Sequence, residues 1–157
     1  MSASVLPRAN VLGLGLIGGS IALALVNAGY DVGATDSDEK RLDEAMQRGI
    51  IQHIGLFEDA VVTFVATPVA LVPDAVALAL SATTGLVTDV GSVKTHVSEG
   101  IHDARFVPGH PMAGSELDGL DGADATMFEG AVWVLTPNSA TSDDAFAAVA
   151  EMVTGFG

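Results

Sequence analysis

Three glycines near the start of the chain have the spacing of a phosphate-binding turn. Gly13, Gly15 and Gly18 form a G-x-G-x-x-G pattern, with Leu16 and Ile17 between the second and third glycine. An apolar run precedes the pattern and a helical pattern follows it, which is the strand-turn-helix context that this motif requires. There the first glycine permits a tight turn, the second lets backbone approach a pyrophosphate, and the third lets helix and strand pack closely. We therefore expect a dinucleotide's pyrophosphate at the N-terminus of the helix.

An acidic residue follows at the distance expected for ribose recognition. Asp36 ends the second apolar run, 18 residues after Gly18. An aspartate at this point accepts hydrogen bonds from ribose hydroxyls and repels a 2′-phosphate, and no arginine adjoins it, so NAD is favoured over NADP. The alternative interpretation is a glycine-rich turn followed by a solvated aspartate, because Asp36, Ser37 and Asp38 would cap the next helix well.

His110 is the candidate catalytic base. It follows an expected strand and precedes Pro111 among small residues. Because imidazole titrates near neutral pH, a histidine can take the proton of a substrate hydroxyl while hydride leaves the carbon that bears it. The alternative is a loop histidine that hydrogen-bonds the backbone, and spacing alone does not separate the two. The other histidines, His53, His96 and His102, lie in or beside helical patterns among polar residues, and we expect them on the surface.

The elements that must position these residues alternate along the chain. Short apolar runs alternate with longer amphipathic stretches, which predicts one α/β domain, residues 1–157, with a doubly wound, mostly parallel sheet of the Rossmann type. We expect strands at 10–14, 31–35, 61–66, 86–89, 105–107 and 131–135, and helices at 18–28, 38–48, 72–80, 94–102 and 143–154. Ser142 is the expected N-cap of the last helix and Gly155 its C-terminal stop. In such sheets ligands bind beyond the carboxyl ends of the strands.

Composition excludes several kinds of partner and site. The 157 residues include 20 acidic and 6 basic side chains, for a formal net charge of −14, which argues against nucleic acid and anionic membrane as partners. The chain has no cysteine, so neither a disulfide nor a thiolate metal site is available, and no metal is expected. The apolar segment 11–26 is too short to span a bilayer and lacks the features of an export signal, so we expect a cytoplasmic protein.

Five motifs occur in a fixed order along the chain: GLGLIGGS, ATD, VATPV, TDVGSVK and GHPMAGSE, followed by LTP after the last expected strand. Together they resemble the prephenate and arogenate dehydrogenases of tyrosine biosynthesis, from Val11 to Pro137. The resemblance implies an NAD-dependent oxidoreductase in which His110 accepts the proton of the ring hydroxyl. Hydride passes from C4 of prephenate to NAD and the ring carboxylate leaves as CO₂, which gives 4-hydroxyphenylpyruvate. Aromatisation makes the step effectively irreversible, so the chemistry needs little beyond orientation and one base.

The resemblance also implies roles for residues on other loops. Ser92 matches a serine that orients the catalytic histidine and the nicotinamide, and Ser115 and Glu116 match a loop that borders the substrate pocket. We expect Thr67 and Pro68 to pack against the cofactor through backbone and ring, with no chemistry of their own. Two alternatives stay open from the residues themselves: Ser92 is also suited to cap the helix expected at 94–102, and Glu116 equally fits a solvated loop acid.

The chain differs from the family in its extent. The resemblance implies a further helical domain that forms the dimer, completes the pocket and carries an arginine for the substrate carboxylates, and we expect the 157 residues to lack it. Only Lys94 and Arg105 are expected near the site. We therefore expect a cofactor domain that folds alone and binds NAD with weak or no turnover, whereas the full-length family enzymes are homodimers. Alternatives are arogenate as substrate, a related dehydrogenase or imine reductase, and a non-catalytic NAD(H)-binding module.

Overall fold

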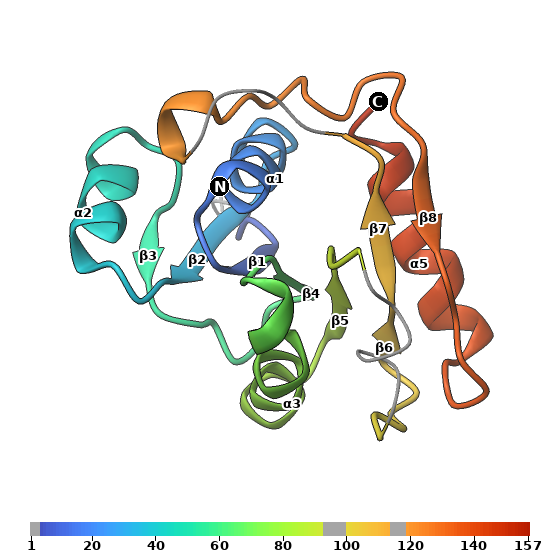
Figure 1. Ribbon diagram of the computed structural model, residues 1–157. Helices are drawn as coiled ribbons and strands as arrows, with labels where there is room; N and C mark the ends of the chain where they lie inside the picture. Colours follow the sequence, from blue (N-terminus) through green and yellow to red (C-terminus); the bar gives the residue numbers. More distant parts are fainter. Residues whose placement is uncertain (1–3, 93–99, 114–118) are drawn as a thin grey trace.

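A parallel sheet of six strands forms the centre of the structure, a computed structural model that describes residues 4–92, 100–113 and 119–157. The strands lie in the order β3-β2-β1-β4-β5-β6, so the strand order reverses between β1 and β4 (Figure 1). The strands are β1 (Arg8–Leu12), β2 (Asp31–Thr35), β3 (His53–Ile54), β4 (Val62–Val65), β5 (Leu86–Asp89) and β6 (Phe106–Val107). Neighbouring strands pair in parallel throughout. The predicted doubly wound sheet is confirmed.

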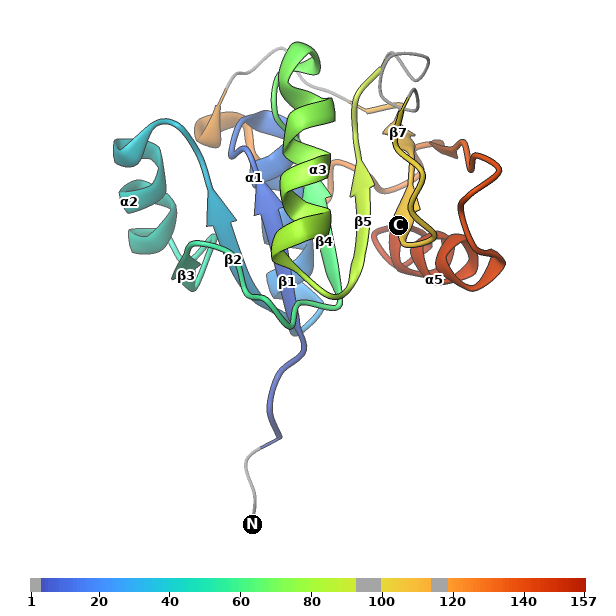
Figure 2. The same cartoon turned by 90° about the horizontal axis from the view of Figure 1, so that it is seen from below.

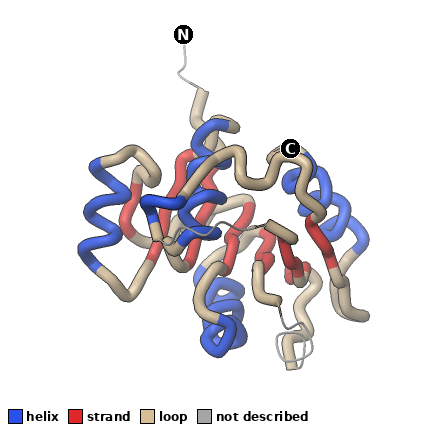
Figure 3. The backbone as a smooth tube through the Cα atoms, turned by 45° about the horizontal axis from the view of Figure 1, so that its top comes forward, coloured by secondary structure: helices blue, strands red, loops and turns tan. Residues whose placement is uncertain are grey.

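Helices cover both faces of this sheet. They are α1 (Leu16–Asn27), α2 (Glu39–Gln47), α3 (Val72–Ala82) and α5 (Asp143–Thr154), with short 3-10 turns η1 (Val69–Leu71) and η2 (Leu120–Gly122). On one face α3 buries Val76 and Ala79 in a cluster with Val65 and Val87 of the sheet. On the other face α1 and α5 share a larger apolar cluster, and Figures 2 and 3 show the strands as a layer between the helices. Strands covered on both sides are mostly apolar, and every residue of β4 is buried.

A second, two-stranded sheet lies beside the first. β7 (Gly109–Pro111) pairs antiparallel with β8 (Trp133–Leu135), with His110 opposite Val134. The sequence analysis expected a strand at 131–135 but did not expect one at 109–111. Three residues that include a glycine and a proline have too little alternation to predict a strand, and the pairing forms only because β8 returns along this segment. The ring of Trp133 packs 5.0 Å from Phe128 between centroids and anchors β8 to the core.

Most expected elements lie within three residues of their observed bounds. The predictions for β2, β5 and α5 match the observed ranges, and Ser142 caps α5 by accepting the N–H of Ala145 at 3.0 Å. α1 begins at Leu16, two residues earlier than expected, because the chain turns into the helix directly after Gly15. The missed strand β3 has only two residues, both exposed, so it carries no apolar signal.

Two further expectations concern helices. Residues 93–99 of the helix expected at 94–102 lie outside the described residues, and residues 100–102 are not helical. Within the described part of the chain, no helix is both long enough and apolar enough to cross a membrane. The segment 11–26, which raised that question, divides between the end of β1, the glycine turn and α1.

Candidate functional site

The glycine turn after β1 is held tightly against the end of β4. Gly13 has a φ of +91°, and a Cβ there would lie 2.6 Å from the carbonyl oxygen of Ala66. A Cβ on Gly18 would overlap the carbonyl of Gly13. Both positions therefore require glycine for close packing of α1 against the strand ends, as the spacing predicts.

Gly15 has a different environment. It is the N-cap of α1, and apart from its chain neighbours no atom of residues 4–92, 100–113 and 119–157 lies within 4 Å of the position that a Cβ would take. A glycine N-cap offers no side chain to the first-turn N–H groups, and that turn holds no acidic residue. These N–H groups carry the positive end of the helix dipole, so the open space beside Gly15 suits an anion that approaches the backbone.

Asp36 follows β2 and reaches across to this turn. Its Oδ2 atom accepts the N–H of Leu14 at 2.7 Å, and its Oδ1 atom accepts the N–H of Asp38 at 2.9 Å. The side chain is only 6% exposed. The N-cap of α2 is Asp38, which accepts the N–H of Lys40 at 3.0 Å. Asp36 is therefore not the residue that caps α2.

Arg41 also lies beside Asp36, which corrects the sequence analysis. Its guanidinium nitrogen Nη1 is 3.4 Å from Oδ2 of Asp36, although the sequence analysis held that no arginine adjoins this acid. The chain folds back into the first turn of α2 after Asp38, and this brings a residue five positions away into contact. Because the guanidinium of Arg41 can bind a 2′-phosphate, only the negative charge of the Asp36 carboxylate favours NAD over NADP.

A cleft of about 650 Å³ lies along the carboxyl ends of β1, β2 and β4. Its lining includes most of the residues predicted to bind a cofactor, namely Gly13, Gly15, Leu16, Ile17, Asp36, Thr67 and Pro68. Leu71, the N-cap of α3, and Leu78, within α3, form an apolar wall of the cleft. Each residue is more than half exposed. Arg41 also lines this cleft and was missed as a site residue. Its position five residues after Asp36, in the first turn of the next helix, was the signal in the sequence that could have found it. Gly18 and Ser92 are not part of the lining.

Thr67 belongs to the lining of this cleft. Its hydroxyl Oγ1 is buried and has no hydrogen-bond partner in the part of the chain that the structure describes. A buried hydroxyl without a partner is unfavourable, but this atom has almost no accessible surface, so it does not face the open cleft. Pro68, the next residue, is exposed and extended at the rim.

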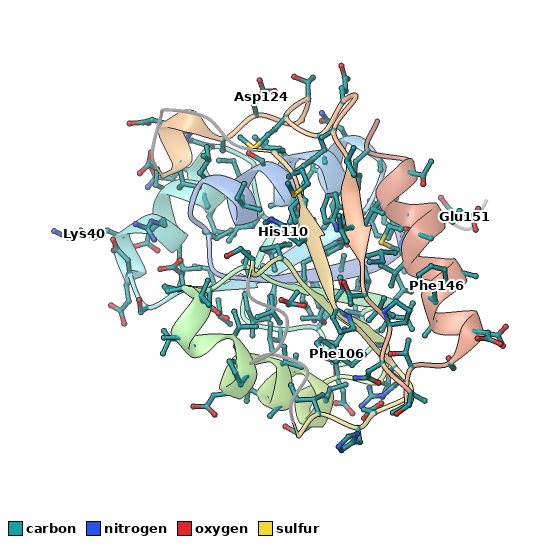
Figure 4. The ribbon with its side chains drawn as sticks, turned by 45° about the vertical axis from the view of Figure 1, so that its right-hand side comes forward. Lys40, Phe106, His110, Asp124, Phe146 and Glu151 are labelled. Carbon is teal, nitrogen blue, oxygen red and sulfur yellow. The ribbon has the colours of Figure 1, made fainter. Side chains whose placement is uncertain are left out.

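His110 is half-buried and lies in β7 rather than in a loop, where it pairs with Val134 of β8. Figure 4 shows it on the side of β7 that faces the central sheet. Its Nδ1 atom lies 3.5 Å from the carbonyl oxygen of Val90, in the turn after β5. Because a carbonyl only accepts hydrogen bonds, this contact favours the tautomer with the proton on Nδ1, and Nε2 is left as a proton acceptor.

Ser92 follows the same turn and is exposed. The N–H of Gly91 donates to Oδ2 of Asp89 at 2.9 Å, which closes the turn one residue before Ser92. The structure therefore brings the segment that carries Ser92 beside the strand that carries His110, through the carbonyl of Val90. The other predicted pocket residues, Ser115 and Glu116, lie outside the described residues, as do Lys94 and His96.

Arg105 is not near the site, contrary to the expectation. Its guanidinium donates to the carbonyls of Leu80 at 2.6 Å, Thr83 at 2.7 Å and Gly85 at 3.1 Å. These carbonyls lie at and after the C-terminal end of α3, where backbone acceptors have no helical partner and a cation is favourable. Arg105 precedes β6, so it lies at the edge of the sheet opposite the cleft.

The other two histidines of the described residues lie on the surface. His53 and His102 are exposed, which confirms the surface prediction, although His53 belongs to β3 and not to a helical segment. The ring of His53 stacks on Phe57 at 4.6 Å between centroids. Among the residues that the structure describes, no three His, Asp or Glu side chains gather where they would hold a metal ion.

Comparison with known proteins identifies the family. The family model of the prephenate dehydrogenase nucleotide-binding domain matches residues 21–157. The prephenate dehydrogenase of Bacillus subtilis is 34% identical over 160 residues, which cover 91% of this chain and 43% of that protein. The chain belongs to the prephenate dehydrogenase family. Its matched part corresponds to the nucleotide-binding domain of that family.

Solved structures agree with this assignment. The arogenate dehydrogenase of Synechocystis has a TM-score of 0.86 at 29% identity, over 96% of this chain and 57% of that one. A prephenate dehydrogenase from Aquifex aeolicus, solved with hydroxyphenyl propionate and NAD⁺, has the same fold, with a TM-score of 0.86 at 24% identity over 99% and 59%. The chain thus spans about half the length of these prephenate dehydrogenase relatives.

Proposed function

We propose that this chain is the NAD(H)-binding domain of an enzyme of tyrosine biosynthesis that oxidises and decarboxylates prephenate to 4-hydroxyphenylpyruvate. His110 is the base that takes the hydroxyl proton, and Ser92 orients it. Arogenate is the alternative substrate, and the likeness to the Synechocystis enzyme supports it. A non-catalytic NAD(H)-binding module of the same fold is the second candidate, because the predicted catalytic residues do not line the described cleft.

One observation carries the cofactor part of the proposal. The open space beside Gly15 and the carboxylate of Asp36 belong to one cleft along the strand ends. In this arrangement the N-terminus of α1 holds the pyrophosphate, and Asp36 accepts hydrogen bonds from the adenosine ribose. The exposed apolar side chains of Leu71 and Leu78 offer a surface on which an adenine ring can pack.

The chemical part of the proposal depends on the tautomer of His110. When bound, NAD⁺ accepts the hydride that C4 of the substrate loses. Val90 holds the proton on Nδ1 of the ring, so Nε2 is free to accept the proton of the 4-hydroxyl. The ring carboxylate leaves as CO₂, and its bonding electrons complete the aromatic ring. His110 therefore gains one proton in each turnover, which solvent later removes.

The first test is calorimetric titration of the chain with NAD⁺. We expect saturable binding of one NAD⁺ per chain and no binding of nicotinamide mononucleotide at the same concentrations, because the mononucleotide lacks the adenosine monophosphate portion and therefore the intact pyrophosphate. A titration without heat, at protein and ligand concentrations in the millimolar range typical of the weakest specific complexes, would remove the proposal.

A second test separates the enzyme from the binding module. At saturating NAD⁺, a nuclear Overhauser effect between the ring protons of His110 and the nicotinamide protons is expected if the histidine flanks the reacting carbon. Substitution His110→Asn should leave NAD⁺ affinity unchanged, while any NADH formed from prephenate or arogenate should disappear. Binding of NAD⁺ with no such Overhauser effect favours the non-catalytic module.

A further inference from the structure

We propose that Asp89 is a positioning residue that fixes the tautomer of His110 and holds the turn of Ser92 beside it. The proposal deepens the proposed function and rests on it for its catalytic meaning. Asp89 is the last residue of β5, and its side chain is completely buried. A buried carboxylate is costly unless hydrogen bonds compensate for its lost hydration, so each of its partners is informative.

Two of these partners are backbone N–H groups on different segments. Oδ2 of Asp89 accepts the N–H of Gly91 at 2.9 Å, and Oδ1 accepts the N–H of Gly109 at 3.1 Å. Gly91 directly precedes Ser92, and Gly109 directly precedes His110. One carboxylate thus connects the two segments that carry the proposed catalytic side chains. Hydrogen bonds to a charged acceptor are stronger than those between neutral groups, so this connection is stiff.

The bond to Gly91 also determines where the carbonyl of Val90 points. The carbonyl of Val90 and the N–H of Gly91 belong to the same peptide unit, which is planar and trans, so the two groups point in opposite directions. With the N–H directed at Asp89, the carbonyl points away from Asp89 and lies 3.5 Å from Nδ1 of His110. A rotation of this peptide would turn the N–H, instead of the carbonyl, toward the ring.

The consequence is a specific protonation pattern. With the carbonyl of Val90 facing it, Nδ1 carries the proton and Nε2 is the acceptor. With an N–H in its place, Nδ1 would have to accept and Nε2 would carry the proton, which makes the ring unable to take a proton from the substrate through Nε2. Asp89 therefore decides, through one peptide unit, whether His110 is ready to act as a base.

The variant Asp89→Asn tests this inference with little change in volume. An amide offers one oxygen acceptor, and its NH₂ group would face one of the two backbone N–H groups, so one of the two bonds is lost. Thr88→Val is the matched control. Thr88 lies on the same strand, is equally buried, and its Oγ1 has no hydrogen-bond partner in the described residues, so replacing the hydroxyl by a methyl breaks no bond.

The readout is the ¹⁵N chemical shift of both ring nitrogens of His110 in the labelled chain, at a pH where the ring is neutral. We expect the Nδ1–H pattern in the native chain and in Thr88→Val, and loss of this pattern in Asp89→Asn. Affinity for NAD⁺ should be retained in both variants, because neither residue lines the cleft. A purely structural role would lower the melting temperature of Asp89→Asn and leave the tautomer unchanged, and this result would overturn the proposal.

The measurement remains decisive if Asp89→Asn does not fold. In the native chain alone, an Nε2–H pattern for His110 would contradict the inference directly. The test is also independent of cofactor binding. If the chain did not bind NAD⁺ but His110 still carried its proton on Nδ1, the proposed function would be contradicted and the role of Asp89 in setting the tautomer would stand.

Discussion

Asp36 Oδ2 accepts the backbone N–H of Leu14 at 2.7 Å, although 22 residues separate the two in the chain. The acid at the end of β2 therefore fixes the glycine turn at the end of β1. This short hydrogen bond to a charged group joins the proposed ribose acceptor directly to the proposed pyrophosphate turn.

Asp36→Ser should shift the cofactor preference toward NADP⁺. The substitution removes the charge that repels a 2′-phosphate and frees the guanidinium of Arg41, now 3.4 Å from Asp36, to bind it. A hydrogen bond to a charged group contributes about 1.5–3 kcal/mol, so the affinity for NADP⁺ should rise about tenfold or more. Calorimetric titration with both dinucleotides measures the change. The double variant Asp36→Ser with Arg41→Gln is the control. Equal NADP⁺ affinity in the single and double variants would show that Arg41 does not bind the 2′-phosphate.

Gly15→Ala should leave the stability of the fold unchanged, whereas Gly13→Ala should lower it. Gly15 has open space where a methyl group would lie, so Gly15→Ala should keep the melting temperature and lose affinity for NAD⁺, because the methyl group stands where backbone meets pyrophosphate. Gly13→Ala should unfold at a lower temperature, since φ is +91° and the methyl group would meet the carbonyl of Ala66. Thermal melts together with NAD⁺ titrations separate the two cases. Normal NAD⁺ affinity in Gly15→Ala would show that the pyrophosphate does not lie there.

Arg105→Gln should destabilise the fold and spare the cleft. The substitution removes the guanidinium donors to carbonyls at the end of α3, and hydrogen bonds from a charged group are worth about 1.5–3 kcal/mol, with the lower end expected for this half-buried side chain. Urea unfolding measures the loss, and NAD⁺ titration should give an unchanged affinity. Lys40→Gln, an exposed change, is the control for the loss of one positive charge. Weaker NAD⁺ binding in Arg105→Gln alone would place Arg105 in the site after all.

The hydrogen bonds from Thr126 to Asp124, in the loop after η2, can be tested by pH titration. The N–H of Thr126, and then its hydroxyl, donate to the carboxylate of Asp124 and hold the pKa of that group below its ordinary value of 3.8. A carboxyl group with a lowered pKa in the folded state stabilises the fold above its ordinary pKa, and this contribution is lost as the pH falls through the folded value. Thr126→Val should raise the pKa of Asp124 toward 3.8 in an NMR titration of its carboxyl carbon. No change in that titration would contradict the role of the hydroxyl.

Local signals in the sequence were sufficient for most of the framework. The alternation of apolar runs and amphipathic stretches predicts a parallel sheet because each strand must be covered on both faces, and β2, β5 and α5 match their predicted ranges. The cofactor residues around Gly13 and Asp36 are equally local, since tight turns and strand ends have compositional rules of their own. Their gathering along one cleft follows from the rule that parallel strands end at the same edge.

The tertiary structure alone decided how separate segments meet. It placed Arg41 against Asp36, directed Arg105 to the end of α3 and paired β7 with β8, which puts His110 in a strand. It also joined the turn of Ser92 to the strand of His110 through the buried Asp89. The sequence by itself predicted the glycine turn, the acid after the second strand and the edge of the sheet where both lie, because these depend on neighbours in the chain and on the rule for parallel strands. Ion pairs, tautomers and strand partners depend on where the backbone returns in space, and composition and periodicity do not encode that path.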